Sequence, residues 1–302
     1  MKLALPRALA QIAAKPSTLR GMGWMLLSSV VVAIFNSIVR QISTTGLHPF
    51  EIAFVHSLFG VLFLSTTYLR HGFGLLKTRR LGLHTMRGTF NVTASLFMTS
   101  AVAITPLAKV AALSFSAPLF ATVLALVLLG EVIRGRRMTA LAVGFLGTWL
   151  VFRPGLVEVD LGSFLVLGFA ACWGSTMIVM KSLARTESSL TMTLYVGLIS
   201  TPLALIAALP FWVTPSWQQL AWLAALGAVG LARQLTLTQA FKEADATAIL
   251  PLDFTRLIWM ALIGYLAFSE VPDIWTWAGG LIIFSATTYI TYREARHRAG
   301  RS

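Results

Sequence analysis

Ten apolar runs, most of them about 20 residues long, follow one another along this sequence. A helix needs about 20 mostly apolar residues to cross the hydrocarbon core of a bilayer, so runs of this length are typical of membrane spans. The pattern predicts an all-α polytopic membrane protein with ten transmembrane helices. We place the spans at 21–40, 50–69, 84–104, 107–129, 138–153, 161–182, 190–212, 218–240, 246–269 and 274–292.

The composition agrees with a membrane protein and argues against a soluble one. The chain is 57% hydrophobic and 12% charged, with a mean hydropathy of +0.78, whereas soluble domains carry about 25% charged residues. The net charge of +13 is spread over connectors and tails instead of forming a basic domain, so we expect no nucleic-acid partner. The single cysteine, Cys172, allows neither an intrachain disulfide nor a cysteine-based metal cluster.

The placement of Lys and Arg predicts the orientation of the chain. Positive charge gathers in both tails and in the connectors after the second, fourth, sixth and eighth runs. Cytoplasmic loops of membrane proteins carry an excess of Lys and Arg. We therefore expect a multi-pass protein of the cell inner membrane with both termini in the cytoplasm. Pro6 and Arg7 interrupt the first apolar segment, which favours a basic tail over a signal peptide.

The two halves of the sequence follow one plan. A shift of 139 residues aligns Ala101–Val132 with Ala240–Val271 and brings Phe115 onto Phe254. Because each half holds five spans, an odd number, the second half would be inverted in the membrane. Inverted repeats recur in secondary transporters, where the substrate site lies near the midplane between the halves. We therefore predict two five-helix repeats, at residues 21–153 and 161–292. Basic cytoplasmic tails, residues 1–20 and 293–302, flank them.

Several features recur in both halves and so point to the fold. Glu131 and Glu270 each follow a span, and we expect them to hold helix ends or loop contacts. Pro118 and Pro251 lie within corresponding spans, where proline frees backbone carbonyls and suits a cavity lining or a hinge, with an ordinary kink as the alternative. Small residues allow close approach of membrane helices. The glycines expected to serve in this way are Gly144, Gly147, Gly279 and Gly280.

The segment "PLFATVLALVLLGE", from Pro118 to Glu131, and the ten-span plan resemble the EamA-type drug/metabolite transporter superfamily over residues 20–293. The segments "PLDFTRLIW" and "SEVPDIWTWAGGLIIF" are similar to one branch of it. That branch contains riboflavin importers, S-adenosylmethionine carriers and exporters of opine-type metallophores. The resemblance implies a metabolite transporter. In one departure, this chain has His56 where many members have an arginine in the second span.

Three ionisable residues lie near the predicted midplane. At 1.5 Å per residue, Asp253 and Arg256 lie about 12 and 16 Å deep and Arg233 about 14 Å deep, against a half-thickness of about 15 Å. Their counterparts in the first half are a serine and two alanines. This asymmetry favours a substrate or coupling role, with Asp253 able to serve both arginines and an arginine suited to a carboxylate or phosphate. The alternative is a brace between Asp253 and Arg256 across one helical turn.

Other side chains complete the predicted site. Histidine can titrate near neutral pH, so His56 is, with Asp253, a candidate for proton coupling. The alternative is a neutral histidine that is hydrogen-bonded within the bundle. Further substrate contacts are predicted for polar and aromatic side chains whose alternative role is core or interface packing. These residues are Gln234, Trp259, Asn36 and Thr99.

The sequence therefore predicts a secondary transporter that moves a small anionic or zwitterionic organic metabolite by alternating access. From the branch resemblance we favour export of an amino-acid-derived compound, such as an opine-type metallophore or an amino acid. Import of a vitamin or nucleoside-like metabolite, such as riboflavin or S-adenosylmethionine, is the alternative, and an intramembrane enzyme is the alternative from another class. No catalytic constellation, metal-ligand motif or Walker loop occurs in the sequence, so we expect no enzyme activity, cofactor or metal. The expected partners are the small-molecule substrate and the lipid bilayer, and a homodimer is possible.

Overall fold

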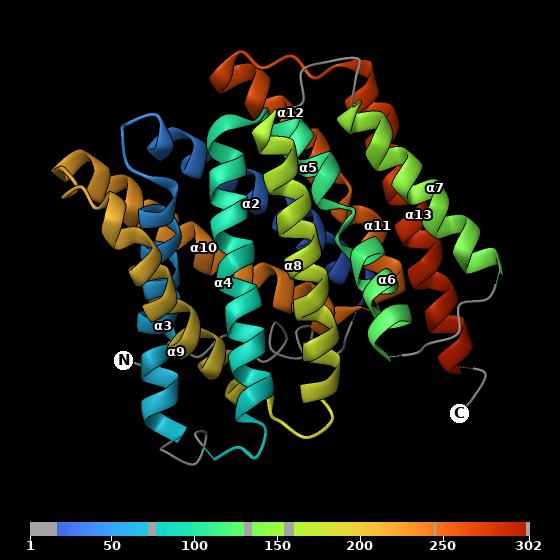
Figure 1. Cartoon of the computed structure of the whole chain (residues 1–302), viewed down its shortest axis with the longest axis horizontal. Helices are drawn as coiled ribbons and strands as arrows, with labels where there is room; N and C mark the ends of the chain where they lie inside the picture. Colours follow the sequence, from blue (N-terminus) through green and yellow to red (C-terminus); the bar gives the residue numbers. More distant parts are fainter. Residues whose placement is uncertain (1–16, 72–76, 130–134, 154–159, 245, 300–302) are drawn as a thin grey trace, which may run out of the picture.

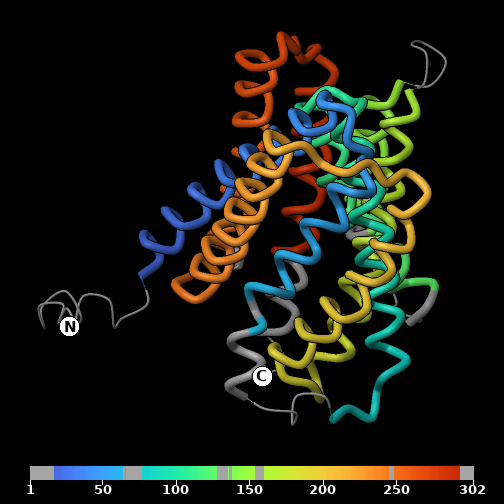
Figure 2. The backbone as a smooth tube through the Cα atoms, turned by 90° about the vertical axis from the view of Figure 1, so that its left-hand side faces the viewer, coloured from blue at the N-terminus to red at the C-terminus, as the bar shows by residue number. Residues whose placement is uncertain are grey.

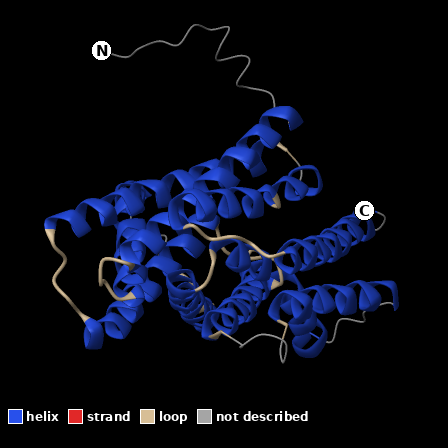
Figure 3. Cartoon of the chain, turned by 90° about the horizontal axis from the view of Figure 1, so that it is seen from above, coloured by secondary structure: helices blue, strands red, loops and turns tan. Residues whose placement is uncertain are grey.

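The computed structural model describes residues 17–71, 77–129, 135–153, 160–244 and 246–299. Within these residues the chain forms helices and no strand, as Figure 3 shows. The helices are α2 (Thr18–Ser43), α3 (Pro49–His71), α4 (Leu81–Ile104), α5 (Leu107–Ser114), α6 (Ala117–Leu129), α7 (Gly135–Phe152), α8 (Leu161–Leu183), α9 (Ser189–Ala208), α10 (Trp217–Glu243), α11 (Ala246–Asp253), α12 (Thr255–Phe268) and α13 (Ile274–Ala299), with a 3-10 turn, η2, at Leu209–Phe211.

Each apolar run of the sequence coincides with a helix or with two consecutive helices. Among the described residues, six helical segments are long and apolar enough to cross a membrane by length and composition. Two of these, Leu107–Val127 and Ala248–Phe268, correspond to the α5–α6 and α11–α12 pairs. The prediction of an all-helical membrane protein is therefore confirmed.

The fourth and ninth runs, predicted as single spans, are each interrupted. Pro118 stands in the first turn of α6, where its missing N–H costs no helical hydrogen bond, and the chain turns at Phe115 and Ser116 before it. The second interruption falls at Phe254, just after Pro251 in α11. The two breaks meet, because the rings of Phe115 and Phe254 lie 5.5 Å apart. The two breaks therefore adjoin within the bundle, where α5 packs on α12.

Helices far apart in sequence pack in pairs, as Figure 1 shows: α4 beside α8, and α7 beside α13. The second pair is close because of glycine. A Cβ on Gly279 would lie 2.7 Å from the Gly147 carbonyl oxygen and 2.4 Å from Val151 Cγ2. Cβ atoms on Gly144 and Gly280 would likewise crowd their neighbours. The expected close packing at these glycines is confirmed.

Helices α2 and α10 run side by side and lean away from α4 and α9 toward one end of the bundle, at the lower left of Figure 2. We call the lower end of the bundle in Figure 2, where α2 and α4 begin, the basic end, because Arg20 lies in the first turn of α2 and Arg80 directly precedes α4. Polar contacts at this end join neighbours. Arg20 pairs with Glu243 at 3.2 Å, and Arg80 donates to the Ser182 carbonyl.

At the opposite end, polar contacts bind several helices together. Glu270, just after α12, pairs with Arg40 of α2 at 3.2 Å and accepts the backbone N–H of Leu107 at 2.7 Å. Arg40 also donates to the carbonyls of Val102 and Ala103 at the end of α4. The expected helix-end role of Glu270 is confirmed, whereas Glu131 lies outside the described residues.

Further ion pairs lie at the same end. Lys109 of α5 donates to Asp160 before α8 at 2.5 Å, and Arg153 after α7 pairs with Asp273 before α13. Glu51 of α3 accepts the N–H of Val213 in the connector between α9 and α10. The opposite end is therefore linked across nearly the whole bundle.

Candidate functional site

The structure contains a cavity of about 620 Å³ beside the two helix breaks. It is lined by the ends of α5 and α11, the starts of α6 and α12, and the faces of α8 and α13. Its charged residues are Asp253 and Arg256. Its aromatic residues are Phe115, Phe169, Trp173, Phe284, Tyr289 and Tyr292, and its hydroxyl-bearing residues include Ser114, Ser285, Thr287, Thr288 and Thr291.

Asp253 and Arg256 form an ion pair across the break between α11 and α12. Arg256 Nη2 lies 3.6 Å from Asp253 Oδ2, and the two side chains are 21% and 28% exposed. The guanidinium carbon lies 4.3 Å from the centroid of the Phe115 ring. Arg256 Nε is buried and has no hydrogen-bond partner among the described residues. At 3.6 Å the pair is longer than an N–H···O hydrogen bond, so the guanidinium retains capacity for an anionic ligand.

Arg233 lies apart from this pair, on α10. Its guanidinium carbon is 4.7 Å from the centroid of the Phe35 ring in α2, and the His56 ring packs against the same phenylalanine at 4.9 Å. Among the described residues Arg233 makes no ion pair, so the structure does not bring it onto Asp253.

The remaining predicted residues lie outside the cavity lining. Asn36 is buried and its amide donates to the Val32 carbonyl at 2.8 Å, while the Thr99 hydroxyl donates to the Ser95 carbonyl at 3.0 Å. Gln234 is exposed on α10. Trp259, one turn beyond Arg256, has a buried indole N–H with no partner among the described residues. A substrate role for these four residues stays a prediction.

The largest contribution that the sequence did not predict comes from α13. Phe284, Thr288 and Tyr292 recur at four-residue spacing and therefore share one face of that helix, which lines the cavity. The rings of Phe284 and Phe254 are 4.5 Å apart. This helical spacing could have identified the face, but it does not distinguish a cavity from lipid.

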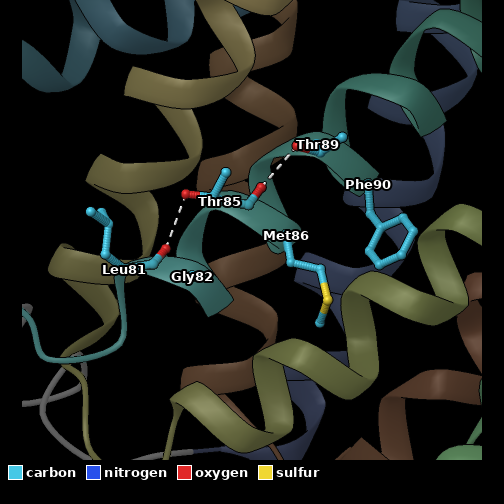
Figure 4. Close-up of a pocket in the computed structure, with 6 residues that line it drawn as sticks. All are labelled: Leu81, Gly82, Thr85, Met86, Thr89 and Phe90. Atoms are coloured by element: carbon cyan, nitrogen blue, oxygen red, sulfur yellow. Dashed lines mark hydrogen bonds between the residues drawn. The ribbon is translucent and has the colours of Figure 1, made fainter.

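A second hollow lies on α4 and is formed by one stretch of that helix, as Figure 4 shows. The residues that line it carry no charge and are Leu81, Gly82, Thr85, Met86, Thr89 and Phe90. The hydroxyls of Thr85 and Thr89 donate to carbonyls of their own helix, at 3.1 and 3.0 Å. The hollow therefore offers a ligand little polar chemistry. Nor do the described residues include a group of three or more His, Cys, Asp or Glu side chains placed to hold a metal ion.

Comparison with protein families identifies the kind of protein to which this cavity belongs. The model of the EamA-like transporter family matches the chain twice, at residues 19–153 and 160–292. The chain belongs to the EamA-like transporter family. The EamA-like chain is thus a multi-pass membrane transporter, and the resemblance noted in its sequence is confirmed.

Relatives of this EamA-like transporter carry different names. It is 33% identical over 278 residues to the S-adenosylmethionine uptake transporter of Rickettsia felis, and the alignment covers 92% of this chain and 94% of the relative. It is 31% identical over 290 residues to the riboflavin transporter of Vibrio cholerae, covering 93% and 96%. It is 26% identical over 264 residues to the pseudopaline exporter CntI of Pseudomonas aeruginosa, covering 86% and 92%.

A solved crystal structure shares the fold of this EamA-like transporter. The two align with a TM-score of 0.58 over 93% of this chain and 97% of the other, at 20% sequence identity. The family and its relatives are transporters, so the comparisons favour transport over enzymatic activity.

Proposed function

We propose that this EamA-like transporter moves a small anionic or zwitterionic organic metabolite across the cell inner membrane. The observation that carries the proposal is the Asp253–Arg256 pair, which stands at a helix break inside the only charged part of the cavity lining among the described residues. Ionisable groups inside a membrane protein cost free energy and mark substrate or ion pathways by default. A carboxylate beside a guanidinium complements a ligand that carries charge of both signs.

The mechanism we propose is alternating access of two inverted five-helix repeats, residues 21–153 and 161–292, between the basic tails 1–20 and 293–302. Two observations support it. The family model matches the chain twice in succession, and the equivalent residues Phe115 and Phe254 lie side by side at equivalent helix breaks. Secondary transporters built from inverted repeats place the substrate at such interrupted helices.

In this mechanism the basic end faces the cytoplasm, together with both termini, because cytoplasmic loops carry the excess of Lys and Arg. The ion pairs at the opposite end, such as Arg40–Glu270, then hold the transporter closed toward the outside. If transport is coupled to protons, Asp253 is the better carrier, because it lines the cavity while His56 packs against Phe35.

Export of an amino-acid-derived compound is the direction we propose. The relative named as a pseudopaline exporter supports it. Import is the second candidate, because a more similar relative is named as an uptake transporter for S-adenosylmethionine. The one aspartate and one arginine of the cavity lining suit a ligand that carries charge of both signs, as an amino-acid-derived compound does.

The test compares small molecules in cells and medium after deletion and after overexpression of the gene. A compound that builds up inside the deletion strain, and in the medium on overexpression, would be an exported substrate. A compound that stays in the medium only when the gene is missing would be imported. No change in any metabolite would refute the transport proposal.

Complementation of the deletion strain then tests the site. Arg256→Gln should abolish transport with normal membrane insertion, because Gln removes the charge that binds the anionic group. Arg185→Gln is the matched control, since Arg185 is exposed in the connector after α8. Wild-type transport by Arg256→Gln would show that the Asp253–Arg256 pair only braces the helix and does not bind the substrate.

A further inference from the structure

The hollow on α4 is open and almost wholly apolar. Its volume is about 550 Å³, within the range of roughly 300–1,000 Å³ that is usual for ligand sites. Every residue that lines it belongs to α4, and the side chains of Leu81 and Met86 are 57% and 41% exposed. The hydroxyls of Thr85 and Thr89 are already bonded to carbonyls of the same helix (Figure 4). An occupant of the hollow would therefore meet hydrocarbon and no free polar group.

The length of the hollow matches one leaflet of a bilayer. From Leu81 to Phe90 an α-helix rises about 14 Å, close to the half-thickness of about 15 Å of the hydrocarbon core. Because α4 begins at the basic end, the hollow extends from the membrane surface at that end toward the midplane. In the proposed orientation this is the cytoplasmic leaflet. The apolar molecule present at this depth is the acyl chain of a lipid.

The segment before α4 adds positive charge at the surface end of the hollow. Lys77 and Arg79 closely precede Leu81, the first lining residue, and both are exposed. Neither forms an ion pair or a hydrogen bond within the part of the chain that the structure describes. Glu187 contacts this segment through the hydroxyl of Thr78, at 2.6 Å, and not through either cation. Two uncompensated cations therefore stand where an apolar hollow meets the membrane surface.

We propose that the hollow on α4 is the binding site of a phospholipid with an anionic headgroup. The acyl chain lies along α4 from Leu81 to Phe90, and Lys77 and Arg79 bind the phosphate. Basic residues next to a membrane span attract anionic lipids, by about fivefold in affinity for each residue. A bound lipid would hold the start of α4, which packs on α8 and α9. This assignment does not depend on which substrate is transported.

Thermal unfolding of the purified full-length protein in dodecyl maltoside micelles tests the assignment. Dioleoylphosphatidylglycerol at a saturating concentration should raise the melting temperature of the wild type by about 5 °C. The zwitterionic dioleoylphosphatidylcholine should raise it by about half as much or less, because its headgroup has no net charge. A variant with both Lys77→Gln and Arg79→Gln should bind the anionic lipid about 25-fold more weakly and respond alike to the two lipids. Lys242→Gln removes an exposed charge at the end of α10 and is the matched control, which should respond as the wild type does.

Gly82→Leu tests the hollow itself. A Cβ atom on Gly82 has no neighbour within 4 Å, so a leucine fills the hollow without disturbing the helix packing. This variant should melt as the wild type does without lipid and should lose the response to dioleoylphosphatidylglycerol. Gly135→Leu, at a glycine with equally open space at the start of α7, should keep that response.

Three results would overturn the assignment. The first is equal stabilisation of the wild type by the two lipids, and the second is a wild-type response of Gly82→Leu. The third is a full response to sn-glycerol 3-phosphate, which has no acyl chain and would mark a phosphate site without a lipid. The double charge variant tests the assignment independently of the fold of Gly82→Leu.

Discussion

The ion pair between Arg40 and Glu270 should be among the strongest single interactions that hold the end opposite the basic end. Its two side chains are 19% and 11% exposed, and the second Glu270 oxygen accepts the N–H of the fully buried Leu107. Removing one partner of a buried pair costs about 3–5 kcal/mol. Because this pair retains some exposure, we expect about 3 kcal/mol for either Arg40→Ala or Glu270→Ala, at the low end of that range.

A double-mutant cycle separates the pair from the other contacts of each residue. Arg40 keeps its two carbonyl partners when Glu270 is removed, and Leu107 loses its acceptor whether or not Arg40 is present. The coupling energy should therefore be smaller than either single effect, at about 1–2 kcal/mol. The assay is equilibrium unfolding by sodium dodecyl sulfate in detergent micelles.

The chain offers a matched control in the Arg153–Asp273 pair at the same end. Its side chains are 22% and 42% exposed, and exposed pairs contribute about 0–1 kcal/mol. The same cycle on this pair should give a coupling energy below that of Arg40–Glu270. A control coupling equal to or larger than that of Arg40–Glu270 would refute the reasoning that burial makes this pair strong.

Two further predictions concern helix packing and acid stability. Gly279→Leu should destabilise the protein by about 1–3 kcal/mol, because its side chain meets the Gly147 carbonyl; Gly82→Leu, at a glycine with open space, should change unfolding little. Burial alone would raise the pKa of Asp160, but hydrogen bonds from Lys109 and a backbone N–H of α8 lower it from 3.8. The stability from this carboxylate is therefore present above about pH 4 and lost as the pH falls through the lowered pKa. In Asp160→Asn the melting temperature should change less with pH between about pH 4 and 2 than in the wild type. An equal change in both proteins would contradict a stabilising role of the Asp160 carboxylate.

The sequence predicts the helices well because the bilayer fixes the length and polarity of a span. It does not locate the interruption at Phe115, because a break within an apolar run leaves the hydropathy unchanged. Asp253 and Arg256 were predictable as candidate site residues because charge is costly in a membrane, and both line the cavity. The cavity face of α13, around Phe284 and Thr288, was not predictable from the sequence. Aromatic and hydroxyl side chains occur on lipid-facing and cavity-facing helices alike.

The place of Arg233 also required the structure. Depth along a helix puts it level with Asp253, but only the packing of α10 on α2 places its guanidinium over Phe35. Asn36 and Thr99 show the converse limit. Their polarity suggested substrate contacts, yet each donates to a carbonyl of its own helix, and a hydrogen bond of this kind leaves no trace in the hydropathy pattern.

Equivalent hydroxyls at the two helix breaks argue that the Asp253–Arg256 pair is not needed as a brace. Ser116 donates to the Leu113 carbonyl at 2.6 Å, and Thr255, its equivalent under the 139-residue shift, donates to the Leu252 carbonyl at 2.7 Å. Each break thus places a hydroxyl on a carbonyl of the preceding turn in the same way, and the first does so with no charged residue in Ser114–Ala117. The charges at the second break are therefore an addition to a local structure that already holds without them, which favours a role toward the substrate.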